Sequence, residues 1–179
     1  HDIALADDFV VPSRDQLSIA LTDTGVTWGP GPFAEPASQL LKRYATDVSD
    51  TLARYDALVV EVQRSTERFV ITHGEPHRAN TIDTAAGVVL IDWDTTLLAP
   101  PERDLWMLLD EDPLIAEQYT ARTGVAVEPE VVQFYRLWWD LCEIALYTAE
   151  FRAAHLDSAD TAAAWRGLCT YLDPARWKT

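Results

Sequence analysis

Two short stretches of the sequence concentrate side chains that could do chemistry. Residues 72–80 are Thr-His-Gly-Glu-Pro-His-Arg-Ala-Asn, and residues 90–95 are Leu-Ile-Asp-Trp-Asp-Thr. Carboxylate and amide oxygens are ligands that suit Mg²⁺, and a carboxylate beside a hydroxyl group can accept its proton. A turn hydrogen bond would be a sufficient explanation for any one of these residues. The whole set, crowded onto two neighbouring strand ends, indicates a functional site.

The spacing within the two stretches narrows the chemistry. His73 and Glu75 are followed by Asn80. Asp92 then comes at the end of the next apolar segment. In phosphoryl-transfer enzymes, a loop acid accepts the proton of the substrate hydroxyl, an Asn farther along the loop binds Mg²⁺, and an Asp after the next strand binds Mg²⁺ that bridges the ATP phosphates. The pattern therefore predicts a phosphoryl-transfer site.

These residues resemble the motif of the aminoglycoside phosphotransferase and related small-molecule kinase family, whose members share the protein-kinase-like fold. The family motif is His-Gly-Asp-x-x-x-x-Asn, followed by a strand that ends in Ile-Asp. Here it stands as His-Gly-Glu-Pro-His-Arg-Ala-Asn at 73–80 and Ile-Asp-Trp-Asp at 91–94. The resemblance continues into Pro-Pro-Glu-Arg-Asp-Leu-Trp at 100–106, where family members have a turn and then a helix that carries an Asp. We expect Asp104 to cap or brace this helix.

The resemblance implies a role for each residue of the motif. Glu75 would be the catalytic base, and His73 would brace the loop through hydrogen bonds. Asn80 and Asp92 would bind Mg²⁺, with ATP as the co-substrate. Asp94 is either a further metal ligand or a cap of the following turn. The expected activity is transfer of the ATP γ-phosphoryl group to a hydroxyl of a small molecule, as in kinases of antibiotic resistance.

An aminoglycoside or a similar aminosugar is the candidate substrate that the resemblance suggests. The chain has 14 basic and 29 acidic residues, a net charge of -15, which would suit a cationic ligand but also simply favours solubility. Asp140, Glu143 and Tyr147 share one face of an expected helix and could form a pocket wall, or belong to an ordinary core helix with its acids in solvent. His77 is either a substrate or phosphate contact or a solvated or structural loop residue.

Secondary-structure patterns predict a predominantly helical α+β fold around these stretches. Short β-branched segments at 68–72 and 87–91 are typical of buried strands, and 80–84 would pair with the second of them through a turn at 85–87. The loop and the metal-binding strand thus occupy about 68–96, on a small β-hairpin element. Apolar residues at helical spacing predict helices over 13–21, 36–63, 102–109, 113–122, 129–153 and 158–172, with Gly124 ending one of them.

The domain organisation follows from the absence of an internal repeat or a linker, which predicts one helical lobe over residues 1–179. The 179 residues contain no Gly-rich phosphate loop, and no strand lysine paired with a helix glutamate. The chain therefore resembles the C-terminal lobe of the protein-kinase-like fold, and a missing N-terminal lobe of the same protein is an expected partner. Glu75 also departs from the family's Asp, and the extra methylene moves its carboxylate outward by about 1.5 Å.

Two other classes of function compete with the kinase. A lobe that has Glu75 in place of Asp, and that lacks a Gly-rich phosphate loop and its lysine, could be a non-catalytic ligand-binding or regulatory module. His73, Glu75 and His77 alternate, as the ligands of a metal hydrolase on a strand would. The intervening Gly and Pro disfavour a strand, and a zinc deaminase would need a Pro-Cys-x-x-Cys segment that does not follow.

The composition argues against several kinds of binding partner and against a disulfide-rich protein. An acidic surplus of this size repels phosphate backbones and anionic lipids, which argues against nucleic acid and membrane partners. No apolar run approaches the roughly 20 residues that span a bilayer, and the first residues lack the basic region of a signal peptide, so we expect a cytoplasmic protein. The two cysteines, Cys142 and Cys169, lie in separate helical stretches and predict no disulfide framework.

Overall fold

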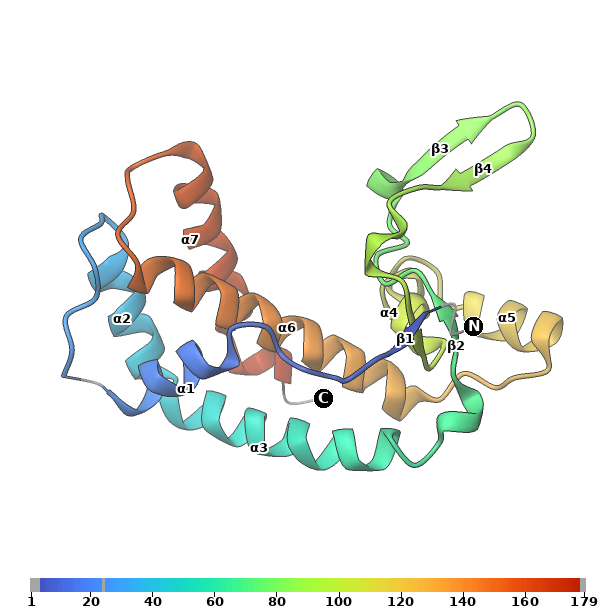
Figure 1. The fold of residues 1–179 in the computed structure, drawn as a ribbon, viewed down its shortest axis with the longest axis horizontal. Coiled ribbons are helices and arrows are strands. Elements are labelled where there is room, and N and C mark those ends of the chain that lie inside the picture. The colour runs from blue at the N-terminus through green and yellow to red at the C-terminus, as the bar shows by residue number, and fades with distance from the viewer. Residues whose placement is uncertain (1–3, 24, 178–179) are drawn as a thin grey trace. The chain divides into compact units, whose positions relative to one another are not determined.

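The computed structural model describes residues 4–23 and 25–177, most of which are helical (Figure 1). The chain divides into two compact units. The first unit comprises Leu58–Arg136 together with the segment that ends at Asp8. The second unit comprises Phe9–Ala57 and the residues from Leu137 onward. The single lobe expected over residues 1–179 stays a prediction.

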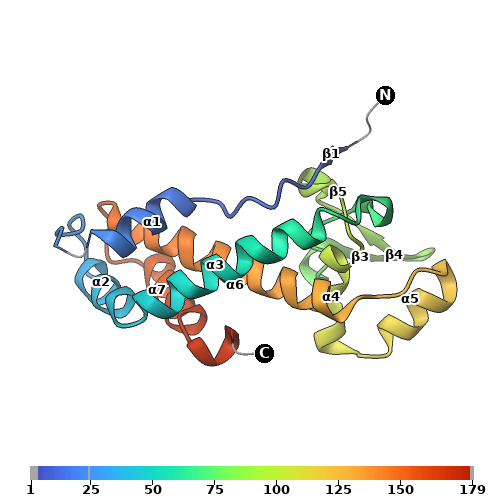
Figure 2. The ribbon, with the colours of Figure 1, turned by 90° about the horizontal axis from the view of Figure 1, so that it is seen from below.

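The first unit carries the described strands in two small sheets. Its three-stranded sheet has the order β1-β5-β2, with β1 parallel and β2 antiparallel to β5. A separate antiparallel hairpin pairs β3 with β4, with Ile82 opposite Val89. Helices α4 and α5 pack against each other in this unit (Figure 2). The elements are β1 (Leu5–Ala6), β2 (Val70–Thr72), β3 (Thr81–Thr84), β4 (Gly87–Leu90), β5 (Leu97–Ala99), α4 (Glu102–Glu111) and α5 (Ile115–Thr123).

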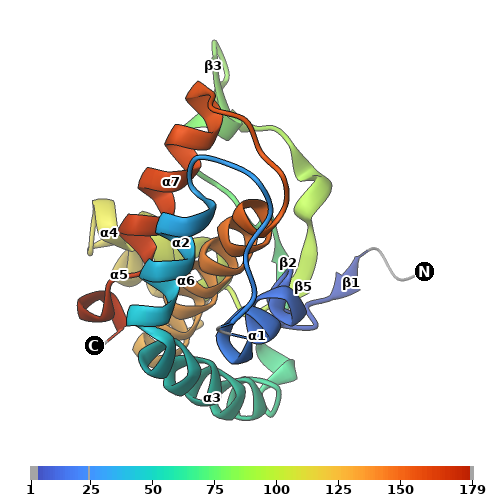
Figure 3. The same ribbon diagram turned by 90° about the vertical axis from the view of Figure 1, so that its left-hand side faces the viewer.

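The second unit is helical, and its elements are α1 (Arg14–Thr22), α2 (Ala34–Arg43), most of α3 (Ala45–Val62), most of α6 (Pro129–Arg152) and α7 (Ala159–Tyr171). Helix α1 packs against α2, and α2 packs against α7 (Figure 3). Helix α7 begins with a capping box between Ser158 and Thr161. Buried side chains of this unit include Leu17, Leu41, Tyr55, Leu141, Ile144, Phe151 and Leu168.

These elements confirm the predicted α+β class, in which most residues are helical and the motif lies on a small β element. The segment 36–63 forms two consecutive helices, which meet at Tyr44. Strands β1 and β5 were not predicted, because segments of two and three residues are too short to show a hydrophobic period. No helix in the described part of the chain is long and apolar enough to cross a membrane.

The expected burial of the strands is wrong. Ile71 in β2 is 51% exposed, and Val88 and Val89 in β4 are 66% and 47% exposed. β-branched apolar side chains favour a strand whether or not its face is covered, so the pattern alone did not reveal exposure. The hairpin therefore presents apolar side chains on an open surface.

Substitution of Gly124 tests how much one left-handed backbone conformation matters for the stability of this fold. It ends α5 with φ +76°, and a Cβ at this position would meet nothing within 4 Å. Gly124→Ala should therefore lower the free energy of unfolding by about 1 kcal/mol, through backbone strain alone. Urea denaturation measures this change. Gly25→Ala is the matched control, because Gly25 is equally open and has no left-handed φ. Equal effects of the two substitutions would contradict the explanation.

Candidate functional site

The loop that carries the motif follows β2 and is held by Asp104 of α4. The Asp104 carboxylate accepts two consecutive backbone hydrogen bonds, from the N–H of His73 at 2.8 Å and from the N–H of Gly74 at 2.6 Å. Gly74 has φ +100°, a conformation that favours glycine. The expectation that Asp104 braces its own helix is therefore corrected: its carboxylate braces the loop.

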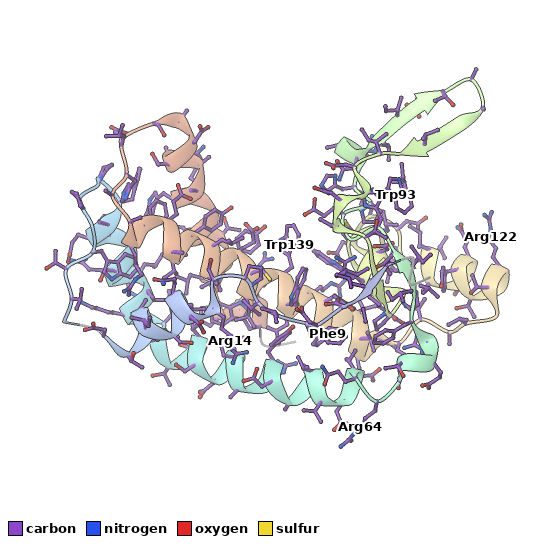
Figure 4. The ribbon with its side chains drawn as sticks, in the orientation of Figure 1. Phe9, Arg14, Arg64, Trp93, Arg122 and Trp139 are labelled. Atoms are coloured by element: carbon purple, nitrogen blue, oxygen red, sulfur yellow. The ribbon has the colours of Figure 1, made fainter. Side chains whose placement is uncertain are left out.

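His73 connects this loop to the segment that follows β4. Its side chain is buried, its Nε2 lies 2.7 Å from the carbonyl oxygen of Ile91, and its Nδ1 accepts the N–H of Glu75 at 3.3 Å. These partners indicate that Nε2 carries a proton and donates a hydrogen bond to the carbonyl oxygen of Ile91, while Nδ1 accepts one. Trp93 packs edge-on against the ring, with centroids 4.7 Å apart, near the base of the hairpin (Figure 4). This geometry supports the bracing role implied by the resemblance.

Asn80 joins Glu75 to the same segment. Its side-chain Nδ2 donates to the backbone carbonyl oxygen of Glu75 at 3.0 Å. Its backbone carbonyl oxygen accepts the N–H of Ile91 at 2.9 Å. Glu75 is thus fixed through both its N–H and its C=O, while its side chain is half-buried. Because the nitrogen of the Asn80 amide is the donor, Oδ1 is the atom that Asn80 can offer to a cation.

Asp92 follows directly after Ile91 and has a left-handed backbone, with φ 65° and ψ 63°. Such a conformation is uncommon for residues with a side chain and concentrates at functional sites. The Asp92 side chain is exposed, as is Asp94 in the following 3₁₀ turn, Trp93–Thr95. The Asn80–Ile91 hydrogen bond brings Asn80 next to Asp92. One amide oxygen and one carboxylate fit Mg²⁺, which commonly completes its coordination with water and phosphate oxygens.

The alternative of a histidine-based metal site finds no support in the geometry. Both ring nitrogens of His73 are engaged, which leaves no lone pair for a metal ion. The segment from His73 to His77 is irregular, so its alternate side chains do not share a strand face. Across residues 4–23 and 25–177, no three His, Cys, Asp or Glu side chains gather as a group that could hold a metal.

His77 lies at the start of the 3₁₀ turn Arg78–Asn80, where its carbonyl oxygen accepts the N–H of Asn80 at 2.9 Å. Its side chain is half-buried, and its Nδ1 is a buried atom without a hydrogen-bond partner among the described residues. The solvated-loop interpretation therefore fits His77 poorly. Contact with phosphate or substrate stays a prediction.

The three residues predicted as a pocket wall belong to the second unit. The Asp140 carboxylate accepts two hydrogen bonds from Arg176, at 3.0 and 2.8 Å. Burial raises the pKa of Asp140, although the Arg176 guanidinium opposes this shift. Arg176 thus occupies the carboxylate that a cationic ligand would need. Burial and a hydrogen bond to Glu143 raise the pKa of the Tyr147 phenol, which keeps it a donor to that carboxylate.

Sequence reasoning missed residues that support the loop from outside the motif. These residues contact the loop or each other, and they are Arg103, Asp7 and Thr95. Thr95 Oγ1, for example, donates to the carbonyl oxygen of His73 at 2.7 Å. Arg103 and Asp7 are 96 positions apart in the numbering, so no local spacing could have linked them.

The sequence of residues 20–138 matches the profile of the phosphotransferase enzyme family, abbreviated APH. The chain belongs to this family. Protein StrN of Streptomyces griseus is a relative with 41% identity over 110 residues, which are 62% of this chain and 31% of StrN. The family recognised from the motif is thus confirmed.

Two solved structures of spectinomycin phosphotransferase APH(9)-Ia share the fold, one in complex with ADP and spectinomycin and the other bound to AMP. Each superimposes with a TM-score of 0.73 and 16% sequence identity, over 96% of this chain. The alignments cover 54% and 55% of those proteins, so the chain spans about half their length and about a third of StrN. The predicted kinase-like, mainly helical C-terminal lobe is confirmed as the fold.

Asp104→Asn tests the brace of the loop. The amide would present a donor to one of the two N–H groups, so we expect the free energy of unfolding to fall by about 2 kcal/mol. The amide hydrogens of His73 and Gly74 should exchange faster with solvent, which NMR measures directly. Asp110→Asn on the same helix is the control, because Asp110 pairs with Arg136 at an exposed position. Unchanged exchange at both amides would refute the brace.

The raised pKa of Tyr147 predicts a pH dependence of stability. The unfolded chain loses the phenol proton near the usual pKa of about 10, while the folded chain retains it to higher pH. Unfolding therefore becomes progressively easier as the pH rises above about 10. Tyr147→Phe should remove part of this loss. Denaturation at about pH 8 and about pH 11, one below and one above the usual phenol pKa, measures the difference. An identical alkaline loss in both proteins would contradict the expectation.

Proposed function

We propose that the chain is the helical lobe of an ATP-dependent O-phosphotransferase that acts on a small hydroxylated molecule. The observation that carries the proposal is a chain of two hydrogen bonds, which links the backbone of the candidate base Glu75, through Asn80, to Ile91, the residue before the candidate metal ligand Asp92. Membership of the phosphotransferase family supports the same reaction. A family relationship alone would not identify which groups act.

In the proposed reaction, the Glu75 carboxylate accepts the proton of the acceptor hydroxyl as its oxygen attacks the γ-phosphorus of ATP. The bond between the γ-phosphorus and its bridging oxygen breaks, and ADP leaves. Asn80 Oδ1 and the Asp92 carboxylate would hold Mg²⁺, with Asp94 as a further candidate ligand. When bound, Mg²⁺ supplies positive charge that offsets the charge of the phosphates. His73 and Asp104 keep the loop backbone in place.

The nucleotide would lie against the hairpin that leads into Asp92. Ile82 and Val89 face each other across β3 and β4 and are 49% and 47% exposed, and Ile91 is 38% exposed. Such an apolar surface suits the face of a nucleobase. A Gly-rich loop and a lysine that bind the phosphates would come from an N-terminal lobe of the same protein. The neighbours APH(9)-Ia bind ADP and AMP, which supports nucleotide use.

The acceptor would be an amino-bearing alcohol such as an aminosugar. Spectinomycin is bound in one of the structurally similar proteins, and the net charge of -15 suits a cationic substrate. Among the three predicted pocket residues, Glu143 is the better candidate for an ammonium group, because Arg176 neutralises Asp140. Tyr147 would orient the Glu143 carboxylate through its hydroxyl.

Turnover of ATP labelled at the γ-phosphate tests the proposal. With Mg²⁺ and a panel of aminoglycosides and other small alcohols, we expect label transfer to at least one acceptor. Glu75→Gln should reduce the rate by roughly two orders of magnitude or more, because it removes the base. Glu67→Gln is the matched control, since Glu67 is an exposed residue outside the loop.

Two results would count against this function. Equal rates in Glu75→Gln and the unsubstituted chain would remove Glu75 from its role. Saturable ATP binding without transfer to any acceptor would instead identify a non-catalytic nucleotide-binding module.

A further inference from the structure

A buried arginine lies directly beneath the loop that carries Glu75. Arg103 is the second residue of α4 and is only 6% exposed. Its Nη1 donates to Thr72 Oγ1 at 2.9 Å, and its Nη2 donates to the carbonyl oxygen of Thr95 at 3.0 Å. Thr72 precedes the loop and Thr95 follows Asp92 and Asp94. One guanidinium group therefore holds both ends of the candidate site.

The loop backbone also rests on this guanidinium group. A Cβ at Gly74 would lie 2.7 Å from both Nη atoms of Arg103 and 2.9 Å from its Cζ. Contacts this short leave no room for any side chain at residue 74. The peptide next to Glu75 thus lies against the face of Arg103, so a displacement of the guanidinium would displace the loop.

The charge of Arg103 is matched by an acid from the start of the chain. Asp7 Oδ2 lies 3.6 Å from Arg103 Nε, and Asp7 is 9% exposed. The Tyr135 hydroxyl of α6 donates a hydrogen bond to the same Oδ2, with an O–O distance of 3.2 Å. Asp7 directly follows β1, and its N–H donates to the carbonyl oxygen of Leu98 at 2.9 Å. A buried ion pair is costly to break on one side only, so these two residues position each other.

We propose that Arg103 is a positioning residue for the phosphoryl-transfer loop and that Asp7 determines its position. The pair couples the N-terminal strand β1 to the peptide beside Glu75. Through these contacts, we expect a change in the position of β1 to be transmitted to the peptide beside the candidate base. The inference rests on the proposed function for its kinetic consequence, but the coupling itself is a property of the fold.

NMR of the isotope-labelled chain tests the coupling without any activity. Asp7→Asn keeps the size of the side chain and removes its charge. We expect the backbone amide signals of His73, Gly74 and Glu75 to shift, although residue 7 is far from them in the sequence. Asp56→Asn is the matched control, because Asp56 pairs with Arg14 at an exposed site through bonds of 2.6 and 2.7 Å. It should leave the loop signals unchanged.

Kinetics then tests the consequence for catalysis. Per folded molecule, Asp7→Asn and Arg103→Gln should each lower kcat by roughly tenfold and leave the KM of the acceptor within about twofold, because misplacement of a reacting group costs rate more than binding. The double variant should be no slower than Arg103→Gln alone, since both act through one contact. Arg103→Lys should recover part of the rate by restoring the charge. If Arg103→Gln does not fold, Asp7→Asn and Arg103→Lys carry the test.

The outcomes separate this inference from the proposed function. Unmoved loop amides in Asp7→Asn, or additive losses in the double variant, would overturn the coupling even in an active phosphotransferase. Shifted loop amides in a chain that transfers no phosphate would confirm the coupling and count against the proposed reaction instead.

Discussion

The candidate site depends on one carboxylate that accepts two consecutive peptide N–H groups. Asp104 does this for His73 and Gly74, and both bonds are charge-assisted. Two successive N–H groups can point at one acceptor only if the backbone turns sharply between them, which is why residue 74 has a positive φ and is a glycine. The direction of the chain after Gly74 then fixes where the His73 ring, the Glu75 peptide and Asn80 lie. A helix on one side of the loop thereby determines the geometry of its open side.

The same bonds bear on the replacement of the family's Asp by Glu75. A longer side chain could be accommodated if the backbone withdrew, but the N–H of Glu75 is bonded to His73 and its C=O to Asn80. The backbone therefore cannot shift without breaking both contacts. The extra bond length must be absorbed by the torsions of the side chain or by an acceptor hydroxyl that lies farther out. In the proposed reaction, Glu75 would constrain the depth at which a substrate sits.

Much of this structure could be predicted because its signals are local. The helices follow from apolar spacing, Gly124 follows from its position at a helix end, and the loop follows from a motif of eight adjacent residues. The contacts that position the motif are not local. Asp140 meets Arg176 and Arg103 meets Asp7 only after the chain has folded, and neither pair leaves a period in the sequence. Exposure of the hairpin was likewise invisible, since β-branched residues favour strands on either kind of surface.

The exposed hairpin has a consequence for the chain in concentrated solution. Within the described residues, β3 and β4 pair only with each other, so each strand keeps one row of unpaired N–H and C=O groups. Val88, Val89 and Ile82 add apolar side chains beside these open edges. Strand edges of this kind are templates onto which a strand of another molecule can add. These open edges and their apolar side chains make the chain prone to self-association, which a molecule bound over the hairpin would suppress.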